Sequence, residues 1–176
     1  APAPNVYYYG LFDNCGQCIS TGDGTGGTGG GCLLGVARGI PGDGMGEGSG
    51  RSSIGTSALG SNEDTGPETF VHEVGHTQGR RHVQCPNADA GGPDPSYPYD
   101  GGVIGVWGFG VRSFKLYHPT ASYDYMSYCS TAWVSDWQWR ATFERIRTLS
   151  SWDAATWNPE GRQLLVGDVD PNTGEG

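Results

Sequence analysis

Residues 72–82 read His-Glu-Val-Gly-His-Thr-Gln-Gly-Arg-Arg-His and hold three of the four histidines of the chain. If this stretch begins as a helix, His72 and His76 lie one turn apart on one face and can point to a common atom. In a continued helix His82 would lie roughly 9 Å further along the axis, too far to join a metal–nitrogen bond of about 2.0–2.1 Å. Gly79 is the residue best able to adopt the left-handed conformation that ends a helix. The spacing therefore predicts a helix that stops near Gly79 and a chain that brings His82 back to the other two histidines.

Three histidine nitrogens with an open fourth position are typical of a catalytic zinc site, whereas a structural zinc site is closed by four protein ligands. Glu73 directly follows His72, so its side chain points off the ligand face and toward the open position. A carboxylate there can take a proton from a water whose pKa zinc lowers to about 7. Two histidines and a glutamate also occur together on helices by chance, but Gly79 and His82 at their required offsets favour the zinc site. We therefore predict one catalytic zinc ion on the three histidines, with Glu73 as the general base.

A second motif lies downstream at residues 122–129, which read Ser-Tyr-Asp-Tyr-Met-Ser-Tyr-Cys. Together the two motifs resemble the HExxHxxGxxH signature and the Met-turn of the metzincin clan of zinc endopeptidases. The resemblance implies that Met126 forms an apolar floor under the three imidazoles. It also implies that Tyr128 binds zinc as a fifth ligand or donates a hydrogen bond to the reaction intermediate, the alternative being a tyrosine packed in a tight turn. Val83, after the third histidine, is not one of the usual family markers, so the family within the clan stays open.

The same resemblance predicts an α+β fold, with a twisted N-terminal sheet, an active-site helix and an irregular C-terminal subdomain closed by a last helix. The catalytic domain is expected over residues 1–160, followed at 161–176 by a strand or linker that leads toward a further domain. In the clan, the strand before the active-site helix pairs its free backbone groups with an extended substrate. The candidate substrate-binding residues are therefore Ser53, Ile54, Gly55 and Thr56.

Five cysteines in a lysine-poor, aromatic-rich chain indicate an oxidising compartment, and we expect a secreted protein. Cys85 lies three residues after His82 and Cys129 three after Met126. If the Met-turn lies under the zinc loop, as the resemblance implies, these two cysteines come close, and we predict a disulfide between them.

The other three cysteines, Cys15, Cys18 and Cys32, lack a nearby fourth ligand for a closed zinc site. A local disulfide between two of them is favoured, and which two stays open. The odd total leaves at least one thiol unpaired. That thiol, or a pro-segment outside this chain, is a candidate for blocking the open metal position in a latent enzyme.

Local sequence signals also predict the main elements. Apolar and β-branched runs indicate strands at 5–12, 32–37 and 52–59. Thr65 and Glu68 form a Thr-x-x-Glu capping box, which predicts a helix over 67–78. Ser135 and Gln138 form a second capping box before a helix over 136–150. The apolar side chains of that helix expected to be buried are Trp139, Phe143, Ile146 and Leu149.

Composition limits the partners of the chain. A formal net charge of −9 over 176 residues argues against nucleic-acid and anionic-membrane partners. No run of about 18 apolar residues is present, which predicts no membrane span. A calcium ion is only weakly indicated, because residues 168–174 imitate no more than part of a calcium loop.

We expect a monomeric endopeptidase that acts on protein or peptide substrates. The competing interpretation is a zinc-bearing module that binds a glycoprotein or peptide without cutting it. Tyr97, Tyr99 and Trp107 would be its binding aromatics, but such a module has no use for Glu73.

Overall fold

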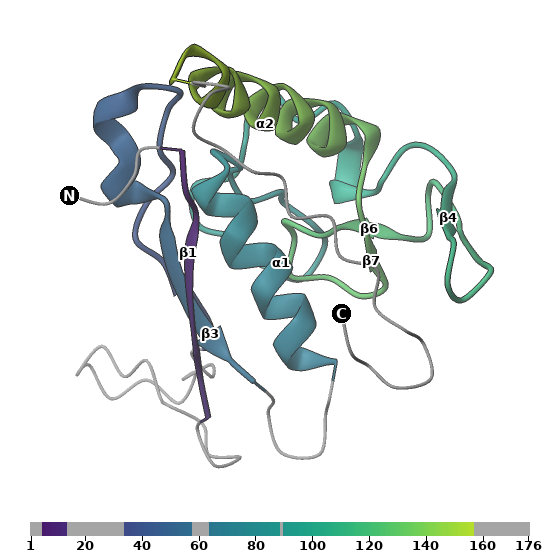
Figure 1. Ribbon diagram of the computed structural model, residues 1–176. Helices are drawn as coiled ribbons and strands as arrows, with labels where there is room; N and C mark the ends of the chain where they lie inside the picture. Colours follow the sequence, from purple (N-terminus) through teal and green to yellow (C-terminus); the bar gives the residue numbers. More distant parts are fainter. Residues whose placement is uncertain (1–4, 14–33, 58–63, 89, 157–176) are drawn as a thin grey trace, which may run out of the picture.

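The computed structural model describes residues 5–13, 34–57, 64–88 and 90–156 of the chain. The described part is a mixed α and β structure with three small sheets and two α-helices, which agrees with the α+β prediction at this coarse level (Figure 1). Its elements are β1 (Tyr8–Phe12), β2 (Gly35–Ala37), the 3₁₀ helix η1 (Met45–Gly50), β3 (Ser52–Thr56), α1 (Thr65–Thr77), the 3₁₀ helix η2 (Asp100–Gly102), β4 (Gly108–Gly110), β5 (Lys115–Tyr117), β6 (Tyr123–Asp124), β7 (Ala132–Trp133) and α2 (Asp136–Thr156).

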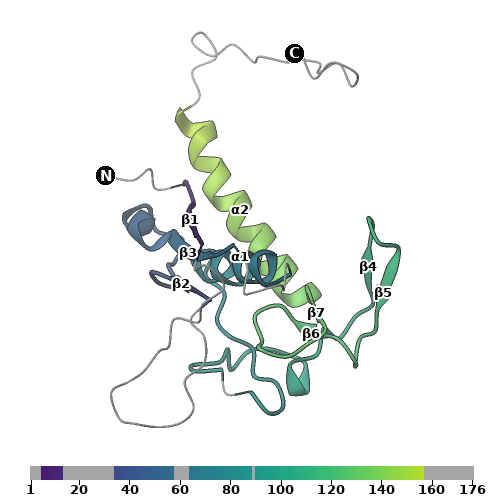
Figure 2. The same cartoon turned by 90° about the horizontal axis from the view of Figure 1, so that it is seen from below.

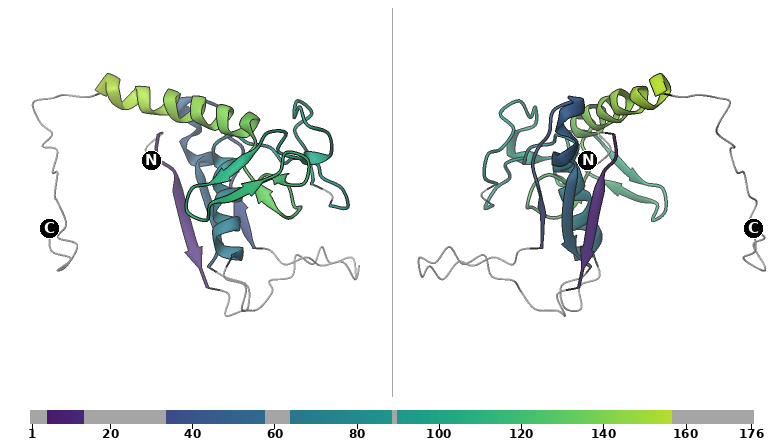
Figure 3. Two further views of the ribbon diagram at one scale, coloured as in Figure 1. Left: turned by 90° about the vertical axis from the view of Figure 1, so that its right-hand side faces the viewer. Right: turned by 60° about the vertical axis from the view of Figure 1, so that its left-hand side comes forward.

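The largest sheet has the order β1-β3-β2, with β1 parallel and β2 antiparallel to the central strand β3. Helix α1 packs against this sheet, and two glycines allow the close approach. A Cβ atom on Gly35 would lie 2.6 Å from Cγ2 of Thr69, and one on Gly55 would lie 2.9 Å from the same atom. Helix α2 lies across one end of α1 and the sheet (Figure 3).

Strand β3 has a hydrogen-bonded neighbour on both sides. On the β2 side, Thr56 N–H donates to Leu34 O at 2.7 Å and Arg38 N–H donates to Ser52 O at 2.9 Å. On the β1 side, the register runs from Tyr8 opposite Ser52 to Phe12 opposite Thr56. The prediction that Ser53, Ile54, Gly55 and Thr56 offer free backbone groups to a substrate is therefore wrong. Among the described residues, β2 and β1 are the edge strands of this sheet.

Helix α1 begins earlier than predicted, and Thr65 does not cap it. Thr65 is already the first helical residue, the N-cap position is Asp64, and no side chain caps the N-terminus. The chain enters the helix while close to β3, since a Cβ atom on Gly66 would lie 1.9 Å from Ser57 O. The N–H of Glu68 donates to Asp64 O at 3.1 Å, so the first turn is closed by backbone alone.

The C-terminus of α1 ends as predicted. Gly79 has φ +82°, the left-handed conformation that the spacing of the histidines required. Its N–H donates to His76 O at 2.8 Å, and Arg80 N–H donates to Gly75 O at 3.0 Å. This pair of bonds is a Schellman motif, which satisfies the last carbonyls of the helix and reverses the chain.

The second half of the described chain contains the β4–β5 hairpin, the two-stranded parallel sheet β6–β7 and helix α2 (Figure 2). Ser135 caps α2 as predicted, because its Oγ accepts the N–H of Gln138 at 3.2 Å. Cys85 and Cys129 form the predicted disulfide across 44 residues. The pairing predicted among Cys15, Cys18 and Cys32, and the strand or linker predicted at 161–176, lie outside the described residues.

The predicted burial of α2 is correct for Leu149, which is 3% exposed, and wrong for the other three apolar residues. Trp139, Phe143 and Ile146 are 58%, 49% and 47% exposed. Polar groups occupy the buried side of the helix instead. Gln138 and Arg145 are two of them, and the guanidinium of Arg145 donates to Gly42 O at 2.6 Å and to Pro41 O at 2.7 Å. No helix among the described residues has the length and apolar character needed to cross a bilayer.

Candidate metal centre

The three histidines of the first motif converge on one point, as their spacing predicted. One ring nitrogen from each of His72, His76 and His82 lies within 4.8 Å of the others. Nε2 of His76 is 3.1 Å from Nε2 of His82. The other described histidine, His118, lies apart from them, where its ring packs against Trp107 with centroids 4.7 Å apart.

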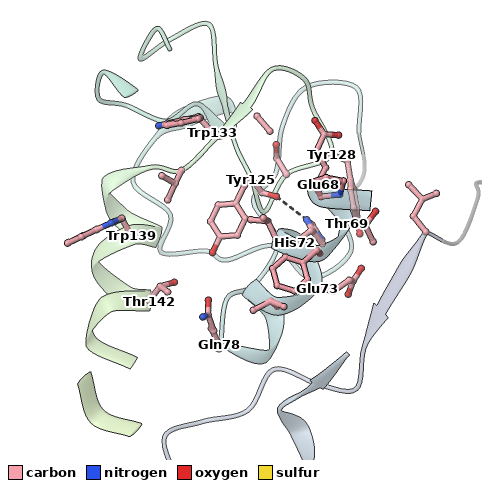
Figure 4. Close-up of a pocket in the computed structure, with 18 of the residues that line it drawn as sticks. Glu68, Thr69, His72, Glu73, Gln78, Tyr125, Tyr128, Trp133, Trp139 and Thr142 are labelled. Atoms are coloured by element: carbon pink, nitrogen blue, oxygen red, sulfur yellow. Dashed lines mark hydrogen bonds between the residues drawn. The ribbon is translucent and has the colours of Figure 1, made fainter. Parts of the chain in front are cut away.

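A backbone carbonyl fixes the orientation of each ring. The carbonyls of Tyr125, Arg80 and Gly91 lie 3.0, 2.8 and 2.8 Å from Nδ1 of His72, His76 and His82, respectively. A carbonyl oxygen can only accept a hydrogen bond, so each Nδ1 carries the proton and each Nε2 presents its lone pair to the centre. Figure 4 shows the bond from His72 to Tyr125.

Three lone pairs that face one another repel unless a cation lies between them. Nε2 of His72 is buried and has no hydrogen-bond partner among the described residues. Burial lowers the pKa of His72 to about 4 and also lowers the pKa of His76. Both rings are therefore neutral at neutral pH, which is the state that a metal ligand requires. The three side chains fit a metal ion.

The loop that carries His82 is tied to the second motif. Val83 N–H donates to Met126 O at 3.0 Å, and the Cys85–Cys129 disulfide joins the same two segments. Met126 itself is fully buried, and a Cβ atom on Gly75 would lie 2.5 Å from its sulfur. The space that Gly75 leaves on α1 is thus filled by Met126, close to the two helical histidines.

Asp124 holds the turn that contains Met126, and sequence reasoning missed it. The residue is fully buried. Its Oδ1 accepts Met126 N–H at 2.9 Å and its Oδ2 accepts Ser135 N–H at 3.1 Å. Burial raises the pKa of Asp124, while these hydrogen bonds act to lower it. The available signal was an acidic residue between two tyrosines, in a segment with no other charge.

Glu73 lies beside the triad and under strand β2. It is 9% exposed, and burial raises its pKa to about 7, against the effect of a hydrogen bond with the backbone of Ala37. A Cβ atom on Gly35 would lie 2.7 Å from Cγ of Glu73, so β2 passes directly over the carboxylate-bearing side chain. Glu73 and His72 line the same cavity, so a buried carboxylate and one of the three histidines border one space.

Tyr128 also reaches the site. Its hydroxyl donates to Nε2 of His82 at 2.8 Å, and its ring stacks on His72 with centroids 5.3 Å apart. The side chain is 56% exposed, so it stands at the mouth of the site rather than in the core. This hydrogen bond brings the Tyr128 hydroxyl to one of the three histidines.

A cavity of about 960 Å³ opens beside the triad, and Glu73, His72 and Tyr128 lie on its wall (Figure 4). It runs between the outer face of α1 and helix α2. The apolar residues on its wall include Phe70, Val71, Val74, Trp133, Trp139, Phe143 and Ile146. The segment after the turn that contains Met126, Ser130 to Val134, supplies part of the wall.

Comparison of the chain with protein-family models, with curated proteins and with solved structures gives no match. The interpretation of the site rests on its residues and their geometry.

Proposed function

We propose that the chain is a secreted zinc-dependent endopeptidase of the metzincin type. The observation that carries the proposal is the convergence of three Nε2 lone pairs beside a buried carboxylate, on the wall of a large cavity. The histidine set, with three nitrogens and no fourth protein ligand among the described residues, is typical of catalytic rather than structural zinc sites. The Cys85–Cys129 disulfide favours an extracellular location.

When bound, a zinc ion supplies a lowered pKa for water and polarisation of a peptide carbonyl. Glu73 takes a proton from a water at the open side of the triad, which then attacks the carbonyl carbon of the peptide bond. Its raised pKa makes it a better base than an exposed glutamate and lets it return the proton to the leaving amine near neutral pH. Tyr128 stands where its hydroxyl can stabilise negative charge on the carbonyl oxygen.

Our proposal assigns the backbone contact with substrate to β2 rather than to β3. Because β3 is paired on both sides, an extended substrate cannot add to it. Among the described residues Gly35–Ala37 forms an edge next to Glu73, and we assign the pairing with substrate backbone to this strand. The cavity between α1 and α2 then receives substrate side chains, and its walls favour apolar ones.

The test uses the protein loaded with zinc, incubated with denatured casein. We expect cleavage that a chelator abolishes and that added zinc restores. Glu73→Gln is the matched control, since it keeps the volume and all three ligands but removes the base. Casein cleavage by the Glu73→Gln variant at the wild-type rate would contradict the mechanism, and tight zinc binding without cleavage would favour the non-catalytic binding module. Tyr97 and Tyr99 support that alternative poorly, because their hydroxyls are engaged within the chain, with Val103 O and Asp136.

Tyr128→Phe separates the roles that Tyr128 can have. A lower kcat/KM at unchanged zinc affinity indicates stabilisation of charge on the substrate. A lower zinc affinity indicates that the hydroxyl is a ligand. If neither changes, the tyrosine only packs in the turn.

A further inference from the structure

The hairpin of residues 106–117 stands apart from the metal centre and carries an unusual surface. Within the described part of the chain its strands β4 and β5 pair only with each other, in the register Gly108 opposite Tyr117 and Phe109 opposite Leu116. The hairpin projects on the side of the molecule away from the three-stranded sheet (Figures 1 and 2).

One face of the hairpin is anchored to the body of the protein. The ring of Tyr117 stacks on Trp133 with centroids 3.9 Å apart and an interplanar angle of 16°. Gly108 lies against the same indole, since a Cβ atom there would lie 2.3 Å from Cδ1 of Trp133. This contact fixes the hairpin, so the opposite face is presented to solvent as a defined surface.

The opposite face and the turn are apolar and exposed. The cross-strand pair Phe109 and Leu116 is 49% and 62% exposed, and in the turn Val111 and Phe114 are 74% and 79% exposed. Isolated exposed apolar residues are ordinary, but a contiguous group at the end of a projecting element marks an interaction surface.

Phe114 is the most informative of the four. Its φ is +53°, in the left-handed region that glycine and asparagine adopt readily and a bulky side chain adopts at a cost. Its ring meets that of Phe109 edge-on, with centroids 6.2 Å apart, but neither the backbone conformation nor burial favours a phenylalanine at this position. An aromatic ring held in solvent at an unfavourable φ is better explained by a partner than by folding.

The charge of the hairpin is opposite to that of the whole chain. The chain has a formal net charge of −9, but no aspartate or glutamate occurs between Asp100 and Asp124. Arg112 lies in the turn and Lys115 in β5, with its ammonium 4.9 Å from the centre of the Tyr117 ring. Arg112 and Lys115 are the charges that the hairpin itself presents to a surface.

We propose that this hairpin docks the protein on the surface of a phospholipid bilayer. Val111, Phe114, Phe109 and Leu116 enter the boundary between headgroups and acyl chains, and Arg112 and Lys115 pair with lipid phosphates. A fluid bilayer can enclose a convex element of this kind from all sides. Covering the four side chains removes on the order of 500 Å² from solvent, less than the roughly 800 Å² per partner that a stable dimer buries. This inference does not depend on the proposed peptidase activity.

The net charge of the whole chain opposes binding to an anionic membrane. Binding should therefore occur through the hairpin, which carries Arg112 and Lys115. The test is co-sedimentation of the wild-type chain with vesicles of phosphatidylcholine alone and of phosphatidylcholine with one-third phosphatidylserine. We expect binding to both, stronger to the vesicles that contain phosphatidylserine and weakened there by added salt.

The variant that tests the turn is Val111→Ser with Phe114→Asn. The asparagine suits the positive φ, so the change should not destabilise the fold. We expect the partition coefficient to fall at least about tenfold. Leu11→Ser with Met45→Ser is the matched control, because it removes two apolar side chains that are 67% and 58% exposed elsewhere on the surface. This control should bind as the wild type does.

Arg112→Gln with Lys115→Gln should retain binding to phosphatidylcholine and lose the added affinity for phosphatidylserine. The proposal is overturned if the wild type sediments with neither kind of vesicle, or if the turn variant binds as well as the control. A wild-type dimer in sedimentation equilibrium that the turn variant abolishes, without vesicle binding, would also overturn it and would show an interface between copies of the chain.

Discussion

Helices α1 and α2 both expose large apolar side chains and bury polar ones, but their buried polar groups point to different places. On α1, His72, Glu73 and His76 are buried and turned toward the open side of the metal centre. On α2, the guanidinium of Arg145 is turned inward, where it bonds the carbonyls of Pro41 and Gly42. The buried polar groups of α1 include two of the three histidines that could bind a metal ion and line a cavity in part, whereas Arg145 of α2 binds the backbone of a distant loop.

Substitutions of the buried polar groups on the two helices should have different effects. A buried polar group that serves a reaction can be replaced with little loss of stability, because the fold does not depend on it. A buried polar group that satisfies backbone carbonyls cannot, because its removal leaves those carbonyls without a partner. Changes on α1 should therefore affect activity, and changes on α2 should affect stability.

Glu73→Gln gives the largest expected effect. The variant removes the base and keeps the three histidines, so we expect kcat/KM on a peptide substrate to fall by roughly 10²–10⁴-fold. Zinc content and the unfolding transition should stay close to those of the wild type. If the variant loses zinc or unfolds, Glu73 is needed for the stability of the fold, as Arg145 is expected to be.

Replacing both cysteines of the disulfide, with Cys85→Ser and Cys129→Ser, tests the link between the loop that carries His82 and the turn that contains Met126. The bridge spans 44 residues. Chain entropy then predicts a loss of up to about 4 kcal/mol of unfolding free energy, measurable by denaturant titration of the metal-free protein. Reduction of the wild type should reproduce the loss. If both forms unfold at the wild-type midpoint, the loop of His82 is held by other contacts.

Arg145→Met tests how much the buried guanidinium on α2 contributes to stability. Loss of its bonds to two backbone carbonyls should cost about 2 kcal/mol. Its ion pair with Asp43 adds little, since that carboxylate is 63% exposed. The control on the same helix is Arg147→Met, where an ion pair with Glu144 is 70% and 51% exposed and the change should stay within about 0.5 kcal/mol. Equal unfolding free energies for the two variants would refute the role assigned to Arg145.

Gly79→Ala tests the point where the two helices meet. A methyl group at φ +82° costs about 1–2 kcal/mol, and it would lie 2.1 Å from Nη2 of Arg145. We expect lower stability together with weaker zinc binding, because the turn positions His82. Gly39→Ala is the control, since a Cβ atom there meets nothing within 4 Å. If Gly79→Ala binds zinc as tightly as the wild type, or if Gly39→Ala also binds zinc more weakly, the turn at Gly79 does not position His82 for metal binding.

The parts of the structure that local spacing determines were predictable. The separation of His72 from His76 and the glycine at position 79 together define the triad, and the structure confirms it. The Cys85–Cys129 disulfide followed from the Met-turn resemblance and is present. Assignment to the metzincin clan and the peptidase activity remain predictions, since no finding tests them.

The parts that depend on distant contacts were not predictable. The central position of β3 depends on pairing with β1 and β2, and the apolar pattern of a strand does not specify its order in a sheet. The exposed apolar face of α2 follows from the burial of Arg145 against a loop more than a hundred residues away. Asp124 was missed because its role depends on the N–H groups of Met126 and Ser135, which only the folded turn brings together.

The three supporting acceptors of the metal centre are main-chain oxygens, belonging to Tyr125, Arg80 and Gly91. Such acceptors are supplied by the peptide unit whatever the side chain, so substitution at these positions does not remove them. The backbone conformation thus fixes the orientation of the three imidazole rings. The apo protein should be assembled before an ion arrives, and cobalt should be able to replace zinc without refolding.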